Sequence, residues 1–416
     1  MVISIVANYI SPRLEYIANF VFQDILGMGL TYSTQVDFGK NCFELRLPNG
    51  KNLLYKSEIL FEEGHTTSED FDWNRLTSKE ELCSNWLGAC FYLLSRMEEY
   101  DTKIKPDQHG RFEYKKSVAY LHGFLEKPLI EVLAQKFINL YFTGYVFPNS
   151  QTKIIPTLDI DMTHAVKGKP IWRVLPAVIQ ELIQQKSIEK FLIWIGRKDD
   201  PYDNFDYQLD FFEKNNLSAI YFFQVGLYGT FDKNLNIQNR RFKEVLEKCK
   251  FQTIAIHPSY ASFQNYSKIE KEILKLKENS GLEIICSRQH FLRFKLPESY
   301  RIIQEVGIQK EYSMGYSESL GFRASVSRPF IWFDLQQNKA TNLTIQPFCV
   351  MDVTLQYFMK LDIEQAKDKI TQIYNQVNNV GGVFSFCFHN ESLCDQKQWK
   401  GWREVFEYAC LSLNHD

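Results

Sequence analysis

Residues 152–164 read TKIIPTLDIDMTH, an apolar run that ends on two carboxylates, Asp159 and Asp161. The run has the length and the β-branched content of a buried strand. Two acids this close repel each other, and moving either of them out of water is costly. The sequence therefore predicts a compensating group at the end of this strand. A metal ion and a proton-transfer role are the two candidates.

The same stretch opens the repeating pattern that sets the fold. From residue 152 onward, short apolar runs alternate with amphipathic segments of helical period, which is typical of βα units in a parallel sheet or barrel. Strand candidates are TKIIPTL (152–158), SAIYFFQV (218–225), FQTIAI (251–256), LEIIC (282–286), a short run near 308–312, NLTIQPFCV (342–350) and GVFSFCF (382–388). Helix candidates are 204–216, 241–249, 266–280, 298–307, 363–380 and 399–413.

The residues before 152 show a different pattern of apolar and polar segments. Short alternating segments such as NCFELRLP (41–48) are mixed with two helix candidates, 85–100 and 128–142, which are separated by the polar loop IKPDQHGRF (104–112). FPNSQ at 147–151 has the composition of a hinge. We therefore predict a smaller mixed α/β accessory domain of unknown role over 1–148 and a second domain over 152–416.

Composition excludes several classes of partner. The 416 residues include 48 basic and 50 acidic ones, a net charge of -2, so no basic footprint for nucleic acid or an anionic membrane is visible. No uncharged apolar stretch approaches the roughly 18–20 residues of a membrane span. The nine cysteines form no CxxC pair, and the first residues lack the basic region of a secretion signal. We expect a cytoplasmic protein, of an oligomeric state that the sequence does not indicate.

Polar residues follow the predicted strands one after another. They are His257, Arg288, His290, Asp352 and His389, in addition to Asp159 and Asp161. In parallel sheets and barrels the carboxyl ends of all strands lie on one face, so these side chains should converge. A single histidine at a strand end is usually a structural residue. Three of them with two aspartates and an arginine on the same face favour a functional site.

The chemistry of this set suits metal-assisted hydrolysis. A divalent ion such as zinc binds imidazole nitrogen and carboxylate oxygen at about 2.0–2.2 Å and keeps a position open in catalytic sites. Such an ion lowers the pKa of a bound water from 15.7 toward about 7. One aspartate can then bind the ion, the other can accept the proton of the water, and a separate histidine can protonate a leaving amine.

These residues resemble the motifs of the polysaccharide deacetylases, the carbohydrate esterase family 4 or NodB-type group. Thr157-Leu158-Asp159-Ile160-Asp161 is similar to the T-F-D-D motif of that family in a D-x-D variant. The resemblance implies a distorted (β/α)7 barrel that removes acetyl groups from N-acetylated sugars with a divalent metal, zinc first and cobalt or nickel as alternatives. By this match Asp159 would be the general base and Asp161 a metal ligand.

The second family motif, H-[ST]-x-x-H, is matched only in part. His257 occupies the first position and looks like a metal ligand, but Ala261 stands where the second histidine should be. This departure leaves the usual Asp-His-His triad one ligand short. We expect His290 to supply the third ligand, with His164 as the alternative.

The remaining motifs concern proton transfer and substrate. Arg288, in SRQHF (287–291), resembles the arginine motif of the family and would keep Asp159 ionised by pairing with it. His389, after an apolar strand, would be the general acid. The backbone N–H of Tyr260 is a candidate oxyanion donor. A looser match in EYSMGYSESLGFRAS (311–325) and the following strand adds Tyr316, Arg323 and Asp352 as residues of the substrate groove.

The resemblance implies a metal-dependent hydrolase acting on an N-acetylated sugar or glycan precursor. Two alternatives stay open. Because Ala261 removes a ligand, the barrel could bind carbohydrate without catalysis. Because the metal site dictates only the type of reaction, the substrate could also be a non-sugar amide.

Overall fold

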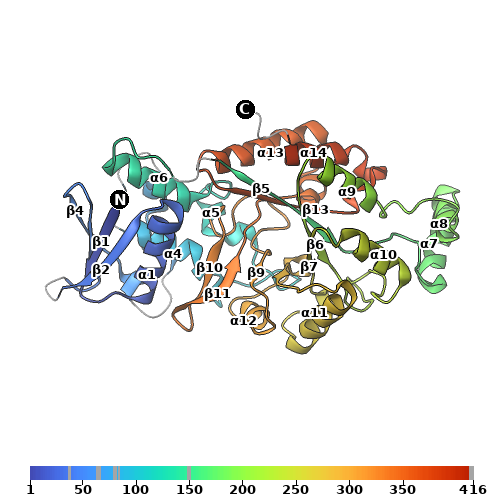
Figure 1. Cartoon of the computed structure of the whole chain (residues 1–416), viewed down its shortest axis with the longest axis horizontal. Helices are drawn as coiled ribbons and strands as arrows, with labels where there is room; N and C mark the ends of the chain where they lie inside the picture. The colour runs from blue at the N-terminus through green and yellow to red at the C-terminus, as the bar shows by residue number, and fades with distance from the viewer. Residues whose placement is uncertain (36–38, 62–66, 78–81, 83–84, 148–150, 412–416) are drawn as a thin grey trace.

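The chain forms two β-sheets, one from residues before the predicted hinge and one from residues after it (Figure 1). The structure is a computed structural model that describes all residues except 36–38, 62–66, 78–81, 83–84, 148–150 and 412–416. The predicted hinge at 147–151 falls mainly on residues outside the described ones.

The first sheet has four strands in the order β2-β1-β3-β4, and only the β1–β2 pair is parallel. Its strands are β1 (Val2–Ala7), β2 (Gly29–Thr34), β3 (Cys42–Arg46) and β4 (Asn52–Lys56). The helices of this part are α1 (Pro12–Ala18), α2 (Glu58–Phe61), α3 (Trp73–Thr77), α4 (Trp86–Leu94), α5 (Val118–Leu121) and α6 (Leu129–Tyr141). The mixed α/β character predicted for this region is therefore observed.

Helix α4 is shorter than the predicted segment 85–100. The Ser95 hydroxyl donates to the carbonyl of Phe91 at 2.7 Å, and Arg96 adopts a left-handed backbone with φ 55°. Both features interrupt the regular helical backbone, so a separate short turn, Met97–Tyr100, follows.

The second sheet has nine strands in the order β10-β11-β9-β8-β7-β6-β5-β13-β12, all parallel to their neighbours except β10. The strands are β5 (Lys153–Ile160), β6 (Ile220–Phe223), β7 (Thr253–Ile256), β8 (Cys286–Ser287), β9 (Lys310–Glu311), β10 (Phe330–Asp334), β11 (Lys339–Ile345), β12 (Val350–Met351) and β13 (Val383–His389). The predicted alternation of strands and helices is confirmed, although β8 covers only the end of the predicted run 282–286 and β10 was not predicted.

One short segment connects strands from distant parts of this sheet. Strand β11 pairs with β9, and four residues later β12 pairs with β13 at the other edge. Pro347 lies in the connection and lacks the N–H that a continuous strand needs, so the predicted strand 342–350 is split in two. The Phe348 N–H donates to the carbonyl of Met314, at 3.2 Å, across the gap.

Helices connect the strands of this sheet and lie against it (Figure 1). They are α9 (Phe205–Lys214), α10 (Arg240–Cys249), α11 (Tyr266–Ser280), α12 (Glu298–Glu305), α13 (Ile363–Asn378) and α14 (Trp402–Leu411). Two further helices that were not predicted, α7 (Ile171–Gln185) and α8 (Glu189–Trp194), follow β5 and extend to the edge of the molecule opposite the first sheet. The predicted end of the last helix, 412–413, is outside the described residues.

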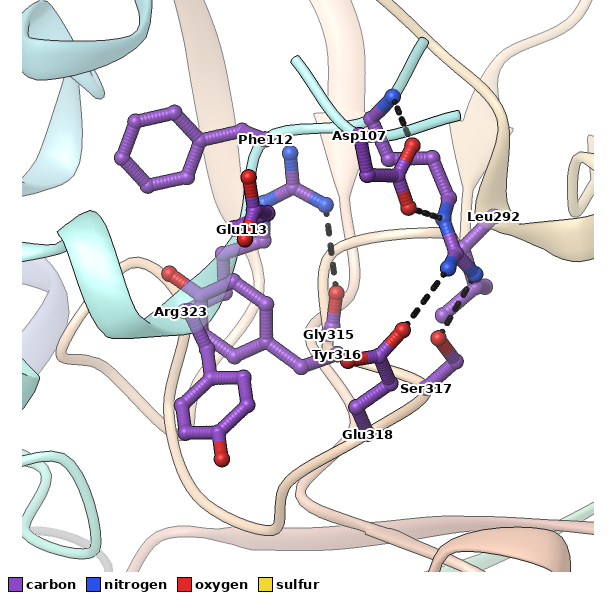
Figure 2. Close-up of a pocket in the computed structure, with 11 residues that line it drawn as sticks. Asp107, Phe112, Glu113, Leu292, Gly315, Tyr316, Ser317, Glu318 and Arg323 are labelled. Atoms are coloured by element: carbon purple, nitrogen blue, oxygen red, sulfur yellow. Dashed lines mark hydrogen bonds and ion pairs between the residues drawn. The ribbon is translucent and has the colours of Figure 1, made fainter. Parts of the chain in front are cut away.

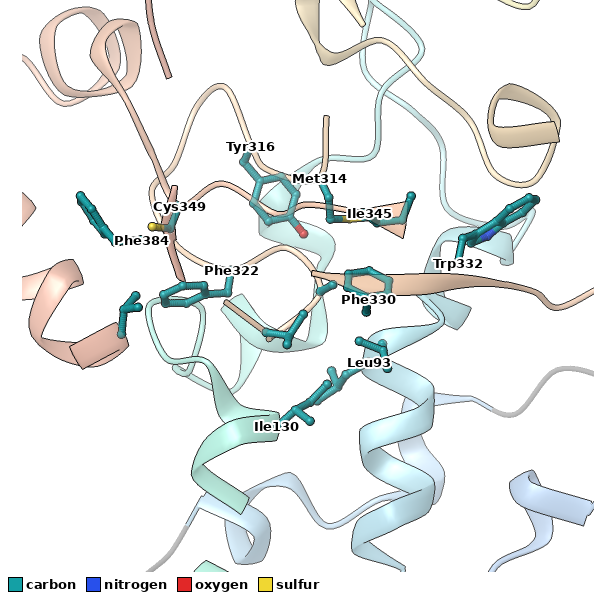
Figure 3. Packing of buried hydrophobic residues seen from close by; sticks show 14 of the residues in the cluster. Leu93, Ile130, Met314, Tyr316, Phe322, Phe330, Trp332, Ile345, Cys349 and Phe384 are labelled. Atoms are coloured by element: carbon teal, nitrogen blue, oxygen red, sulfur yellow. The ribbon is translucent and has the colours of Figure 1, made fainter. Parts of the chain in front are cut away.

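The two sheets share one hydrophobic core. Leu93 of α4 and Ile130 of α6 lie beside Phe322 and Phe330 of the second part (Figure 3). Backbone bonds cross the same interface, including Phe322 N–H to the carbonyl of Leu125 at 2.8 Å. The approach there depends on Gly321, whose φ is 113° and whose missing Cβ would lie 2.3 Å from that carbonyl oxygen. The first part is therefore packed directly against the second.

Among the described residues, no helix combines the length and the apolar character needed to cross a bilayer.

Candidate metal centre

The site is built on the carboxyl end of β5, where Asp159 closes the strand ladder and Asp161 follows it. Asp159 is buried, whereas the side chain of Asp161 is 28% exposed and faces three histidines. The Nε2 atoms of His257, His290 and His389 lie 3.2, 3.4 and 4.0 Å from Asp161 carboxylate oxygens. Burial alone would raise the pKa of Asp161, but His290 and His257 outweigh it and hold that pKa well below its usual range.

His257 follows β7 and has its tautomer fixed by the backbone. Its Nδ1 atom lies 2.6 Å from the carbonyl oxygen of Arg288. A carbonyl can only accept a hydrogen bond, so Nδ1 carries a proton and Nε2 points toward Asp161. This is the arrangement that metal-binding histidines adopt, with the second nitrogen held by an outer partner.

His290 lies in the loop after β8 and is oriented by a residue that the sequence did not single out. Its Nδ1 atom is 3.0 Å from Oδ1 of Asp232. Asp232 also accepts from the N–H groups of Tyr260 and Ala261, at 2.8 and 3.3 Å. Burial alone would lower the pKa of His290, but the carboxylates of Asp161 and Asp232 outweigh this effect and raise that pKa to about 9. Asp232 thereby turns Nε2 of His290 toward Asp161.

The donor set fits a divalent cation. Asp161, His257 and His290 each offer one ligand atom, and these atoms lie within 4.8 Å of one another. Oδ1 of Asp161 is buried and has Nε2 of His257 3.2 Å away, so the carboxylate and the imidazole converge on the same point. One carboxylate and two imidazoles are a set that zinc and similar ions bind. The three residues predicted as ligands are thus brought together.

Asp159 and Arg288 form a buried ion pair beside this cluster. Nη1 of Arg288 donates to Oδ1 of Asp159 at 2.8 Å. The guanidinium is fully buried, donates through Nε to the carbonyl of Tyr312, and lies over the ring of Phe222. Burial alone would raise the pKa of Asp159, but Arg288 and the neighbouring histidines lower it below its usual value. Asp159 is therefore held as a carboxylate.

His389 ends β13 and is held by Asp352. The Nδ1 atom of His389 lies 2.8 Å from Oδ1 of Asp352, and the backbone N–H of His389 donates to the other oxygen at 2.7 Å. Burial alone would lower the pKa of His389, but Asp352, Asp161 and Asp159 raise it well above its usual value. Its Nε2 faces the site, 4.0 Å from a carboxylate oxygen of Asp161.

These groups lie at the base of a pocket with about 910 Å³ of open space. Polar residues of the base are Asp159, Asp161, His257, His290 and His389. The walls include Gln108, His109, Arg111, Gln289, Phe291, Leu292, Ser317, Glu318, Met351, Val353, Phe358 and Glu391. Gln108, His109 and Arg111 belong to the polar loop 104–112, so the N-terminal region contributes directly to the pocket.

Arg111 supports an unusual backbone beside His290. Phe291 and Leu292 both have left-handed φ values, 61° and 51°, which cost about 1–3 kcal/mol each in residues with a Cβ. Arg111 donates to the carbonyl of Phe291 at 3.3 Å and to the Ser317 hydroxyl at 2.7 Å. Its other nitrogens pair with Asp107 and Glu318. The N-terminal region therefore helps to fix the loop that carries His290.

Several predicted residues have other partners than expected. The N–H of Tyr260, expected to be an oxyanion donor, is bonded to Asp232 and is not free. Asp352, expected in the groove, is fully buried and contacts His389 instead. His164, the alternative third ligand, faces Asp203, with Nε2 to Oδ2 at 3.4 Å, and not Asp161.

Tyr316 and Arg323 line a smaller neighbouring cavity of about 310 Å³ (Figure 2). Both are buried, and Arg323 pairs with Glu99 of the N-terminal part at 2.6 Å. Arg96 extends this network, with its Nη2 3.4 Å from the Tyr316 hydroxyl. These two residues therefore join the two parts of the chain, whereas the sequence suggested that they line the substrate groove.

Comparisons with known proteins give the following matches. The model of a family of unknown function, DUF7033, matches residues 3–141. No curated protein matches the sequence.

Among solved structures, a protein assigned as a polysaccharide deacetylase from Mycobacterium smegmatis is 12% identical with a TM-score of 0.41, over 65% of this chain and 87% of that one. The polysaccharide deacetylase Bc1974 from Bacillus cereus is 9% identical with a TM-score of 0.28, over 62% and 86%. A CE4 family pseudoenzyme from Bacillus anthracis is 8% identical with a TM-score of 0.31, over 63% and 60%. The chain thus has a distant structural similarity to CE4 polysaccharide deacetylases, at values that say nothing about its activity or substrate.

Proposed function

We propose that the chain is a metal-dependent hydrolase that removes an N-acetyl group from a sugar or glycan precursor, on a distorted (β/α)7 barrel of NodB type. The observation that carries the proposal is the convergence of Asp161, His257 and His290, three residues from three different loops, beside a paired carboxylate and a charged histidine. Such a combination of ligands, base and acid in one pocket is suited to cleavage of an amide.

Asp161, His257 and His290 would hold the ion. A bound divalent cation supplies Lewis-acid polarisation of the acyl group and makes water acidic enough to react at neutral pH. Zinc suits this mixed nitrogen and oxygen set, and cobalt or nickel are the alternatives. His290 takes the place of the histidine that Ala261 replaces in the H-[ST]-x-x-H pattern.

The protein groups divide the proton transfers between them. Asp159, kept ionised by Arg288, accepts the proton of the attacking water. His389, kept protonated by Asp352, donates a proton to the nitrogen that leaves. Both residues line the same pocket as Asp161. Acetate and a free amine are the products.

A sugar substrate is favoured by the walls of the pocket. Phe291 and Phe358 offer apolar faces, and Gln108, Gln289 and Ser317 offer hydrogen-bonding groups. A sugar ring, with apolar faces and hydroxyl edges, matches this mixture.

We also propose, from the sequence, that the protein acts in the cytoplasm.

The direct test measures metal-dependent acetate release. Protein stripped with a chelator and reloaded with zinc, cobalt or nickel would be assayed on N-acetylated sugars and on N-acetylated amino acids. Release from the sugars only after reloading supports the proposal. Stoichiometric metal without release from any substrate would favour an inert carbohydrate-binding barrel, and release only from amino acids would favour a non-sugar amidase.

A further inference from the structure

An exposed apolar surface lies on the pair of helices that follows β5. Of the 27 large apolar side chains that are exposed among the described residues, nine lie between 171 and 195 and three more at 227–231. The α7–α8 surface is defined by Ile171, Trp172, Leu175, Ile179, Leu182, Ile183, Ile188, Phe191, Ile195, Leu227 and Tyr228. A soluble protein rarely leaves so many such side chains together unless they contact something.

Helix α7 has one broad apolar face, and only part of it is covered. Its inner face packs Val174 and Val178 against Ile193 of α8 in a small separate cluster. Its outer face repeats apolar residues at helical spacing, at Leu175, Ile179 and Ile183, where a solvated helix carries polar ones. The inner face accounts for the fold of the pair, and the outer face is left without a partner in this chain's described residues.

The surface carries more basic than acidic residues. Residues 167–200 contain seven Lys or Arg and four Asp or Glu, a net charge of +3 in a protein whose total is -2. Two of the lysines, Lys167 and Lys198, pair with Asp199 and Glu189. A pocket of about 800 Å³ opens beside it, lined by Lys169, Arg173, Lys190 and Lys233 and by no acidic residue. The two acids of the helices, Glu181 and Glu189, line an adjoining pocket that shares Lys190 with this one.

The surface is continuous with the face that holds the candidate metal centre. Trp172 of α7 contacts Tyr228 of the loop after β6, with ring centroids 5.3 Å apart. Arg173 lies 4.0 Å over the same tyrosine ring. Three residues further on, Phe231 contacts Phe291 of the pocket wall, at 5.2 Å. Because α7 and this loop follow the carboxyl ends of β5 and β6, both lie at the edge of the sheet where the pocket opens.

We propose that the α7–α8 surface docks on an anionic phospholipid membrane surface, with the apolar side chains in the interface and lipid phosphates at the basic pocket. An apolar helix face edged by Lys and Arg, with Trp and Tyr among its exposed residues, is the pattern of interfacial membrane binding. A second copy of the chain would bring two net-positive surfaces together, which is unfavourable. The whole-chain charge balance predicted no such partner because it averages over this local cluster.

Vesicle flotation tests the proposal. Full-length protein should bind vesicles of phosphatidylcholine with phosphatidylglycerol, bind pure phosphatidylcholine weakly, and lose binding in about 1 M salt, where the Debye length is about 3 Å. Ile179→Ser with Ile183→Ser, and Lys190→Gln with Lys233→Gln, should each weaken binding about tenfold or more. The matched controls, Val146→Ser with Phe251→Ser and Lys243→Gln with Lys271→Gln, should bind like the parent protein.

Three results would overturn the proposal: no binding to the anionic vesicles, equal loss in the control variants, or a parent dimer that the serine variant converts to a monomer. Circular dichroism establishes that each variant is folded. The experiment is independent of the proposed hydrolase function, because Asp161→Ala should retain vesicle binding while losing metal. A protein that binds vesicles but never metal would refute the hydrolase proposal alone.

Discussion

Nδ1 of His290 lies 3.0 Å from Oδ1 of Asp232, a carboxylate that is itself fixed by two backbone N–H groups. This contact sets the direction of Nε2 in the residue that stands in for the missing histidine at position 261. Asp232→Asn should weaken zinc affinity about 10–100-fold, the usual effect of removing an outer partner of a ligand. Titration against a chromophoric chelator measures it, and Asp203→Asn is the matched control beside His164. Unchanged affinity in Asp232→Asn would show that His290 needs no such orientation.

Substitution of Asp159 should affect turnover and leave metal binding intact, unlike substitution of the ligand Asp161. Asp159→Asn keeps the shape of the side chain and should retain metal while turnover falls about 10²–10⁴-fold, the usual contribution of a general base. Metal content and steady-state turnover on the same preparation test this. Loss of metal together with activity would instead make Asp159 a ligand.

The loss of hydrolysis rate on substitution of His389 should be larger for a substrate with a poorer leaving group. His389→Gln should lower amide hydrolysis about 10²–10⁴-fold, because the amine must be protonated as it leaves. A 4-nitrophenyl acetate ester needs no such proton, so its hydrolysis should fall far less. Parallel assays of both substrates with metal-loaded protein give the comparison. An equal loss on ester and amide would contradict a general-acid role.

Arg111 should link the N-terminal region to the site. Arg111→Ala removes bonds to Phe291, Ser317 and two carboxylates, and hydrogen bonds to charged groups contribute about 1.5–3 kcal/mol each. We expect a higher KM and weaker metal affinity, because the left-handed Phe291 backbone adjoins His290. Thermal unfolding, KM and metal titration would be compared with Arg46→Ala, a variant of an exposed arginine on the first sheet. If only thermal stability changes, Arg111 is a structural residue and does not position the site.

The sequence predicted the parts of the site that follow strands. Asp159, His257 and His389 come directly at or after apolar runs, and parallel pairing brings such positions to one edge. Asp232 and Arg111 were not predicted, because each lies in an irregular loop whose partner is distant in sequence. The one signal for Arg111 was the polar loop 104–112, whose position beside the pocket depends on tertiary packing.

The helices α7 and α8 were missed for a different reason. Residues 171–185 are apolar at helical spacing, but they include Pro176, which usually marks the end of a helix. Tyr316 and Arg323 were expected near the substrate because they fall within a family-like segment. Their burial against Arg96 and Glu99 depends on the packing of the N-terminal part, which has no strand-end pattern to reveal it.

The most direct test of the central claim is an anomalous difference map from crystals grown with zinc or cobalt. The account predicts a single strong peak about 2.0–2.2 Å from one carboxylate oxygen of Asp161 and from Nε2 of His257 and His290. A map in which these three side chains hold no ion, or in which the ion binds elsewhere in the chain, would contradict it.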